Sequence, residues 1–408
     1  MSDVEGPRVS RRSLLERIEA APPTDVIAVI EDELTAAVGA HGVSFLIADY
    51  VGRAVVRFDR WTWSVPDGRE PVVEHSETVP LPGTVYERVM QTQRVDLRDT
   101  DSGVVAVVPV TVTGDALGAL ELRLPARPDE QALLLIEAVA HALAYIVVVN
   151  RRYTDLFERG QRTAPMSLAA EIQRRLLPSS FTHQAPQFTV AGWLEPATTV
   201  GGDTFDYAVD HGMLHVSITD AVGNDVNAAL LATVLVGSLR NGRRQGMTLA
   251  DQTRFANDAL AAHSSVGDFV TGQVLRVDLN TGATTLVNAG HLFPLLLRDG
   301  EVRELQLEID LPFGLYPGRD FRLQRLDLQP GDRLLLVTDG VLDRNSAHHD
   351  VPAALAASFG KHARELVHEL GDLVLHATGG KLRDDATVLC LDWTGLEATR
   401  AEPGKTES

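Results

Sequence analysis

Hydrophobic positions in the first third of the chain change their period several times. From Val26 to Ala40 they recur every three or four residues, which predicts a helix that ends near Gly39. Apolar runs typical of strands, and further helical stretches, follow it. The strands are expected at 43–48, 54–58, 103–112 and 116–124, and the helices at 83–92 and 129–153. This order predicts an α+β sensory module over residues 26–150.

The second half reads as many short strands joined by turns, with three helices among them. Turn signals stand at 210–212, 280–282, 298–300 and 330–332, and the helices are expected at 227–244, 248–263 and 361–378. The remaining parts are a flexible leader or short helix over 1–25, a charged helical connector over 151–178 that Gly160 and Pro165 interrupt, and a polar tail over 394–408. The second module then covers 179–393. The longest apolar stretch, Ala132–Asn150, carries Glu137, His141 and Tyr145, which favours a packed amphipathic helix over a membrane span.

Charge and cysteine content narrow the class of protein. The 408 residues include 37 Lys and Arg against 56 Asp and Glu, a formal net charge of −19. That balance argues against partners that are polyanions, such as nucleic acid or an anionic membrane. The single cysteine, Cys390, cannot form an internal disulfide, and residues 1–12 lack the apolar core of a signal peptide. We therefore expect a cytoplasmic protein.

Aspartates in the second half stand where the chain changes direction. Asp203 follows two glycines, Asp220 and Asp339 each end an apolar strand, and Asp384 with Asp385 opens the last strand. Carboxylates that converge at strand ends repel one another, and a hard divalent cation relieves that repulsion. Oxygen ligands suit Mg²⁺ or Mn²⁺, and two such ions can clamp a phosphoryl group. The spacing thus indicates a metal-dependent hydrolase, with Asp385 considered as an additional ligand.

Each of these residues also has an ordinary structural interpretation. An Asp before Gly at a strand end is usually a turn or cap residue. Asp206 and Asp225 are expected to be capping or surface groups, and His291 to be a hydrogen-bonded core or loop residue. Trp61 and Trp63 are expected to be packing groups. The sequence has no phosphate loop of Walker or Rossmann spacing and no serine elbow.

The order of the motifs resembles that of bacterial PPM-type Ser/Thr phosphatases of the SpoIIE and RsbU type. The resemblance covers residues 170–393, and each motif is short, so its strength lies in the shared order. The motifs are AEIQRRLLP (170–178), VGGDTFDY (200–207), TDAVGND (219–225) followed by AALL (228–231), NAGH (288–291), LPFGL (311–315), TDGV (338–341) and DDAT (384–387).

This resemblance implies a fold, a metal site and a reaction. The fold is an α/β/β/α sandwich of antiparallel sheets. Asp220 would bridge two Mg²⁺ or Mn²⁺ ions, Asp203 and the carbonyl of Ala221 would hold one, and Asp339 and Asp384 the other. A metal-bridging hydroxide would attack the phosphorus of a phosphoserine or phosphothreonine. The substrate implied is a STAS-type anti-sigma-factor antagonist.

Two segments depart from the family pattern. The family often has Gly-His-Gly where this chain has Gly223-Asn224-Asp225, and the segment after Asp339 is short. All four of the aspartates implied to bind metal are present, which argues against an inactive homologue. The altered segments bear on loop shape and substrate recognition.

The first module resembles a GAF sensory domain by element order, length and position. It is expected to bind a small molecule or a partner and to control the phosphatase through the connector, by which the chain would also form a homodimer. Two other functions stay open from the residues alone. They are a non-catalytic ligand-sensing scaffold and a hydrolase of a small phosphoester.

Overall fold

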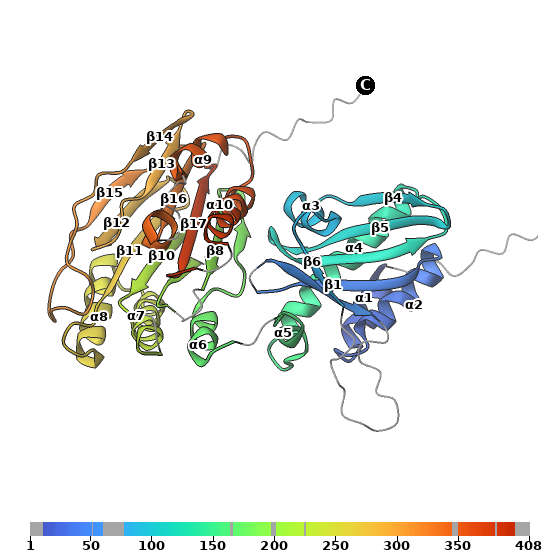
Figure 1. Ribbon diagram of the computed structural model, residues 1–408, viewed down its shortest axis with the longest axis horizontal. Coiled ribbons are helices and arrows are strands. Elements are labelled where there is room, and N and C mark those ends of the chain that lie inside the picture. The colour runs from blue at the N-terminus through green and yellow to red at the C-terminus, as the bar shows by residue number, and fades with distance from the viewer. Residues whose placement is uncertain are drawn as a thin grey trace, which may run out of the picture. The chain divides into compact units, whose positions relative to one another are not determined.

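The computed structural model describes residues 11–50, 52–59, 77–163, 166–196, 201–223, 226–344, 350–379 and 382–395. The chain divides into two compact units, Met1–Pro165 and Met166–Ser408, each with its own cores (Figure 1).

The first unit is an antiparallel sheet with helices on both faces. Alternation along β1 sends Phe45 and Ile47 into the larger core, beneath α1, α2, α4 and α5, while Leu46 faces the smaller core beneath α3. The strand order is β3-β2-β1-β6-β5-β4. The strands are β1 (His41–Ala48), β2 (Ala54–Asp59), β3 (Thr78–Pro80), β4 (Asp96–Thr100), β5 (Gly103–Val112) and β6 (Asp115–Leu124), and the helices are α1 (Arg11–Ala20), α2 (Val26–Val38), α3 (Val85–Thr92), α4 (Glu130–Asn150) and α5 (Leu156–Gly160).

Two segments lie beside the predicted sensory module. Residues 11–20 form a helix, which is one of the two alternatives expected for the leader, because Ile18 is buried in the first core and Arg17 pairs with the buried Glu33. The connector is not one element. Its α5 buries Phe157 in the first core, and the Gln161 side chain donates to the carbonyl of Ala48 at 2.8 Å, whereas its second half belongs to the other unit.

The second unit is two antiparallel sheets packed face to face, with helices outside each. One sheet has the order β15-β12-β11-β10-β9 and the other β14-β13-β16-β17-β8-β7. Its strands are β7 (Thr182–Gln184), β8 (Phe188–Glu195), β9 (Thr204–Asp210), β10 (Met213–Ala221), β11 (Val270–Asp278), β12 (Ala283–Ala289), β13 (Leu295–Arg298), β14 (Glu301–Glu304), β15 (Gln324–Asp327), β16 (Asp332–Val337) and β17 (Ala386–Trp393), and its helices are α6 (Leu168–Leu176), α7 (Val226–Arg244), α8 (Leu249–His263), the π-helical turn Gly340–Arg344, α9 (Val351–Ala357) and α10 (Ala363–Thr378).

Burial follows the two-residue period of the strands and produces three layers of core. Leu214, Val216 and Ile218 of β10 meet Leu389 and Leu391 of β17 in the core between the sheets. Separate cores lie between β10–β12 and the helices α7 and α8, and between β16–β17 and the helices α9 and α10. This is the α/β/β/α sandwich that the resemblance implied, and that expectation is confirmed (Figure 1).

Three of the four expected turns join neighbouring strands of one sheet, at 210–212, 280–282 and 298–300. In the first, His211 and Gly212 have φ angles of 48° and 75°, and positive φ at both central residues is what a two-residue type I′ hairpin turn requires. The turn at 330–332 was expected to be a hairpin and is not one, since it carries the chain from β15 in one sheet to β16 in the other. Trp61, Trp63, Asn224 and Asp225 lie outside the described residues.

Candidate functional site

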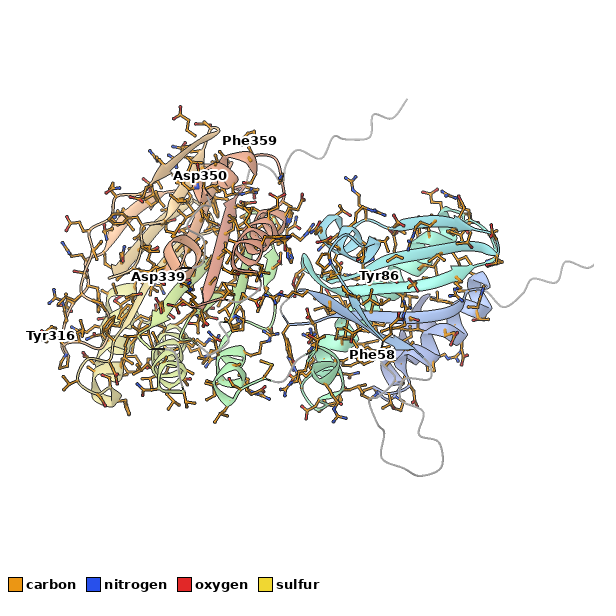
Figure 2. The ribbon with its side chains drawn as sticks, in the orientation of Figure 1. Phe58, Tyr86, Tyr316, Asp339, Asp350 and Phe359 are labelled. Carbon is orange, nitrogen blue, oxygen red and sulfur yellow. The ribbon has the colours of Figure 1, made fainter. Side chains whose placement is uncertain are left out.

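The predicted aspartates lie at one end of the two sheets. Thr204 pairs with Thr219, so the register of β9 and β10 sets Asp203 beside Asp220. In the other sheet Val337 pairs with Val388, and the Thr338 amide donates to the Thr387 carbonyl at 3.1 Å, so the residues that follow β16 meet those that precede β17. The strand ends that carry Asp203, Asp220, Asp339, Asp384 and Asp385 thus come together, and Figure 2 labels Asp339 among them.

Asp203 is the buried centre of this group. Only 3% of its surface is exposed, and its Oδ2 accepts hydrogen bonds from the hydroxyls of Thr338 and Thr387, both at 2.7 Å. Burial raises the pKa of Asp203 well above its ordinary value. The charges of Asp220 and Asp385 raise that pKa further, and the two hydroxyls act against the rise. The structure therefore concentrates negative charge around Asp203.

Asp385 is held by two groups that lie within the quoted motifs but were not predicted to be site residues. The Gln173 side chain on α6 donates from Nε2 to Asp385 Oδ2 at 2.6 Å and to the Asp203 carbonyl at 2.8 Å. The Gly201 amide donates to Asp385 Oδ1 at 3.1 Å. These contacts join α6, the loop before β9 and the start of β17, so Asp385 holds the backbone of the site together.

Asp339 and Asp384 are half-buried and lie next to the strand ends. The Asp384 carboxylate accepts a hydrogen bond from the Asp385 amide at 3.0 Å, and Asp339 is followed by the π-helical turn that begins at Gly340. Thr338 and Thr387 point toward Asp203.

The glycines at the site allow close backbone approach. A Cβ on Gly201 would lie 2.5 Å from the Asp385 carboxylate carbon, and one on Gly202 would lie 2.5 Å from the Cβ of Ala221 and 2.8 Å from its carbonyl oxygen. A Cβ on Gly340 would lie 1.8 Å from the Asp385 carbonyl oxygen. Any larger residue would push apart the strand ends that carry the carboxylates.

Of the other candidate residues, His291 has the structural role expected for it and Asp206, expected to be a capping or surface group, does not. His291 is buried, its Nδ1 lies 3.0 Å from the Thr271 hydroxyl, and its backbone amide and carbonyl both bond to the Asn288 side chain. Burial lowers the pKa of His291 to about 4, so its ring is neutral at pH 7. Asp206 is buried rather than at the surface, and it pairs with Arg240 and Arg243 of α7.

Within the described residues, no group of three or more His, Cys, Asp or Glu side chains is arranged so that it could hold a metal ion. The donors that do converge are all oxygens. The Asp203 carboxylate is buried close to the charges of Asp220 and Asp385, and a divalent cation would relieve that repulsion. Mg²⁺ is commonly bound by one or two carboxylates, with waters completing its shell. The donor set of the site therefore fits such an ion.

Sequence comparisons place this unit among known proteins. The profile of the family described as Stage II sporulation protein E (SpoIIE) matches residues 210–394. Phosphoserine phosphatase RsbU of Bacillus subtilis (strain 168) is 21% identical over 272 residues, which cover 63% of this chain and 81% of RsbU. Phosphoserine phosphatase RsbP of the same organism is 25% identical over 188 residues, which cover 44% of this chain and 45% of RsbP.

Among solved structures, the RsbU and RsbW domains of Rv1364c from Mycobacterium tuberculosis align with 25% identity and a TM-score of 0.46, over 52% of this chain and 61% of that one. The two sequence alignments cover most of the length of RsbU but less than half of the length of RsbP. Residues 210–394 of the second unit thus match a SpoIIE PP2C-type phosphatase domain, and the homologues RsbU and RsbP are phosphoserine phosphatases. The motif around Asp203 and the α6 segment precede the residues matched by the family profile.

Proposed function

We propose that the chain is a metal-dependent protein serine/threonine phosphatase. The observation that carries this proposal is the buried Asp203, whose pKa is raised by burial and by two neighbouring carboxylates, in the same unit as the SpoIIE match. Groups with such perturbed pKa values cluster at functional sites. Two relatives bear the name phosphoserine phosphatase, which supports the same reaction here.

The residues proposed to hold Mg²⁺ or Mn²⁺ are those expected from the sequence. Asp220 is assigned to both ions, Asp203 and the Ala221 carbonyl to one, and Asp339 and Asp384 to the other. When bound, such ions supply water of lowered pKa and neutralise phosphoryl charge. Asp385 is assigned to positioning, since both its oxygens already accept hydrogen bonds from Gln173 and Gly201.

The protein's own groups prepare the site for this chemistry. The hydroxyls of Thr338 and Thr387 fix the orientation of the Asp203 carboxylate and favour its charged form. Gln173 ties the Asp203 backbone to Asp385, so the loop of the first acidic motif and the start of β17 keep one arrangement. Rigid support of this kind keeps ligands oriented without further reorganisation.

The substrate proposed is a phosphorylated regulatory protein of the anti-sigma-factor antagonist type. Its support is the similarity to RsbU and RsbP together with the name those proteins carry. The first unit is proposed to be a GAF-like sensor of a small ligand or partner that controls the phosphatase. A cytoplasmic location agrees with the single cysteine, Cys390, which is buried and free.

The test is phosphate release from a phosphoserine protein and from a chromogenic phosphoester, each with Mn²⁺, Mg²⁺ or EDTA. Asp220→Asn is expected to lower the rate at least about 10²-fold, because it removes an oriented charge from the centre of the site. Asp299→Asn is the matched control, since it removes the same charge from an exposed hairpin turn and should leave the rate unchanged.

The outcomes separate this function from the two others left open. Metal-dependent release that Asp220→Asn abolishes supports a phosphatase, and a strong preference for the phosphoprotein supports a protein substrate. Turnover of the small ester alone would favour a small-molecule hydrolase. Absence of metal-dependent release from either substrate would favour the scaffold.

A further inference from the structure

Exposed apolar side chains gather where the chain leaves β10 and where it enters β11. Val222 is the first residue after β10, Val226 is the first residue of α7, and Phe269 directly precedes β11. Val222, Val226 and Val266 are 37%, 41% and 108% exposed, and Phe269 is half-buried. We call Val222, Val226, Val266 and Phe269 the apolar lip.

The lip continues the sheet that carries Asp220. The Val222 amide donates to the Phe269 carbonyl at 3.0 Å, one step beyond the pairing of Ala221 with Val270. Ala221 and Val270 are both buried in the core beneath α7 and α8. Because side chains alternate along paired strands, Val222 and Phe269 face away from that core.

Polar contacts fix the loop that carries Val266. The Asp268 carboxylate accepts hydrogen bonds from the Ser265 amide at 2.9 Å and from the Asn227 side chain at 3.4 Å. Asn227 lies in the first turn of α7, so the second contact joins this loop to the start of that helix. Side chains on an ordered support lose less conformational entropy when a partner covers them.

The lip lies inside the area that a phosphoprotein substrate must cover. Val222 is two residues beyond Asp220, which is about 7 Å along a strand. A specific protein–protein contact covers about 800 Å² on each partner, which corresponds to a disc of about 16 Å in radius. A protein that brings a phosphorylated side chain to the acidic site therefore covers the lip, whereas a small phosphoester reaches the site without doing so.

Long-range electrostatics do not favour the approach of such a substrate. The chain has a net charge of −19, and a phosphoserine carries about −1.5 to −2 charge at pH 7. The two therefore repel each other before contact. Burial of apolar surface is independent of charge and is the main favourable contribution in most protein complexes. The lip thus suits a partner that offers apolar side chains beside its phosphate.

We propose that the apolar lip selects the substrate, an inference that rests on the proposed phosphatase function. The substrate class is a protein whose phosphoserine or phosphothreonine is flanked by exposed apolar side chains, and those side chains pack on the lip. The lip acts in substrate binding and takes no part in the chemical step.

Two phosphoserine peptides of equal length and charge test this, one with leucine on both sides of the phosphoserine and one with serine there. The full chain with Mn²⁺ is expected to have at least about tenfold higher kcat/KM for the leucine-flanked peptide. Val226→Ser/Val266→Ser should reduce that preference to within about twofold, because it removes apolar surface without adding charge. Val209→Ser is the matched control, since it changes a 48%-exposed valine at the other end of the same sheet, about 20 Å from Asp203, and should keep the preference.

Fluorescence anisotropy gives a second measurement that needs no turnover. In the Asp220→Asn variant with Mn²⁺, the labelled leucine-flanked peptide should bind at least about tenfold more tightly than the serine-flanked one, and Val226→Ser/Val266→Ser should remove the difference. If the double variant does not fold, Val266→Ser changes a fully exposed residue and should still lower the preference at least about threefold.

The proposal would be overturned if the two peptides were turned over and bound equally well, or if the lip variants kept the wild-type preference. A binding preference that the lip variants remove, without metal-dependent turnover of either peptide or of a chromogenic phosphoester, would support recognition by the lip and refute the proposed phosphatase function.

Discussion

Gln173 on α6 offers the sharpest test of how the acidic site is held. Its amide nitrogen donates to the Asp385 carboxylate and to the Asp203 carbonyl, and only 2% of the residue is exposed. Gln173 is not one of the proposed metal ligands, and it precedes the residues matched by the family profile. A change here therefore reports on positioning and leaves every proposed metal ligand in place.

The magnitude follows from the two contacts. A hydrogen bond to a charged acceptor contributes about 1.5–3 kcal/mol and one to a backbone carbonyl about 0.5–1.5 kcal/mol. Gln173→Ala should thus lower the free energy of unfolding of the second unit by about 2–4 kcal/mol. Gln173→Glu puts a carboxylate where the amide lies 2.6 Å from Asp385, and two charges at that distance repel by about 6 kcal/mol at an effective dielectric of 20. Its effect should therefore be the larger one.

The assay is phosphate release as a function of Mn²⁺ concentration, beside urea unfolding followed by the fluorescence of Trp193 and Trp393. Gln173→Ala is expected to lower kcat/KM at least about tenfold and to raise the Mn²⁺ concentration needed for half-maximal rate. Arg175→Ala is the matched control on the same helix. The Arg175 side chain is 68% exposed and pairs with Glu171 on the helix surface, so its loss should change stability by less than about 0.5 kcal/mol.

The reasoning would be refuted if Gln173→Ala lost stability but kept both its rate and its Mn²⁺ requirement within twofold of wild type. In that case Gln173 would act only in packing. If Gln173→Ala does not fold, Gln173→Asn serves as the second variant, because it keeps the amide on a shorter side chain. A wild-type Mn²⁺ requirement in Gln173→Asn would equally contradict the need for these two contacts.

Three further predictions follow from the second unit. Gly202→Ala should abolish phosphate release, because its Cβ would lie 2.5 Å from that of Ala221, whereas Gly237→Ala on α7 meets nothing within 4 Å and should stabilise the chain by up to about 1 kcal/mol. His291 has a pKa of about 4 when folded against 6.5 unfolded, so the unfolded chain binds more protons between these values. The free energy of unfolding should therefore fall by up to about 3 kcal/mol as the pH drops from 7 to 4. Urea unfolding of His291→Gln should show a fall that is smaller by this amount. Arg333→Met should cost about 3–5 kcal/mol in urea unfolding, because it leaves a partly buried carboxylate of β17 without its cation, and an unchanged midpoint would contradict this.

Local pattern was sufficient to predict most helices and strands. The apolar spacing of 26–40 and 248–263 corresponds to α2 and α8, because each helix packs one face against a core. Short elements with weak patterns, such as β4 and α9, were missed. The helix α1 was expected only as an alternative to a flexible leader, since it depends on burial of a single residue, Ile18, among polar neighbours.

The order of the acidic motifs likewise sufficed to recognise the phosphatase family and to mark which aspartates stand at strand ends. It could not show what supports them. Thr387 reaches Asp203 across 184 residues of sequence, and Gln173 reaches Asp385 across 212. Such contacts depend on how the two sheets stack, and no local period records that.

The long helix α4 illustrates the same difference. The sequence predicted a packed amphipathic helix there, because helix formation and apolar content depend on residue type and on spacing along one segment. Which side of that helix the first core covers, and which side it leaves exposed, was decided only by the tertiary structure. The physical reason is that apolar residues lie on more than one side of α4. The side that becomes buried therefore depends on which neighbouring elements pack against it.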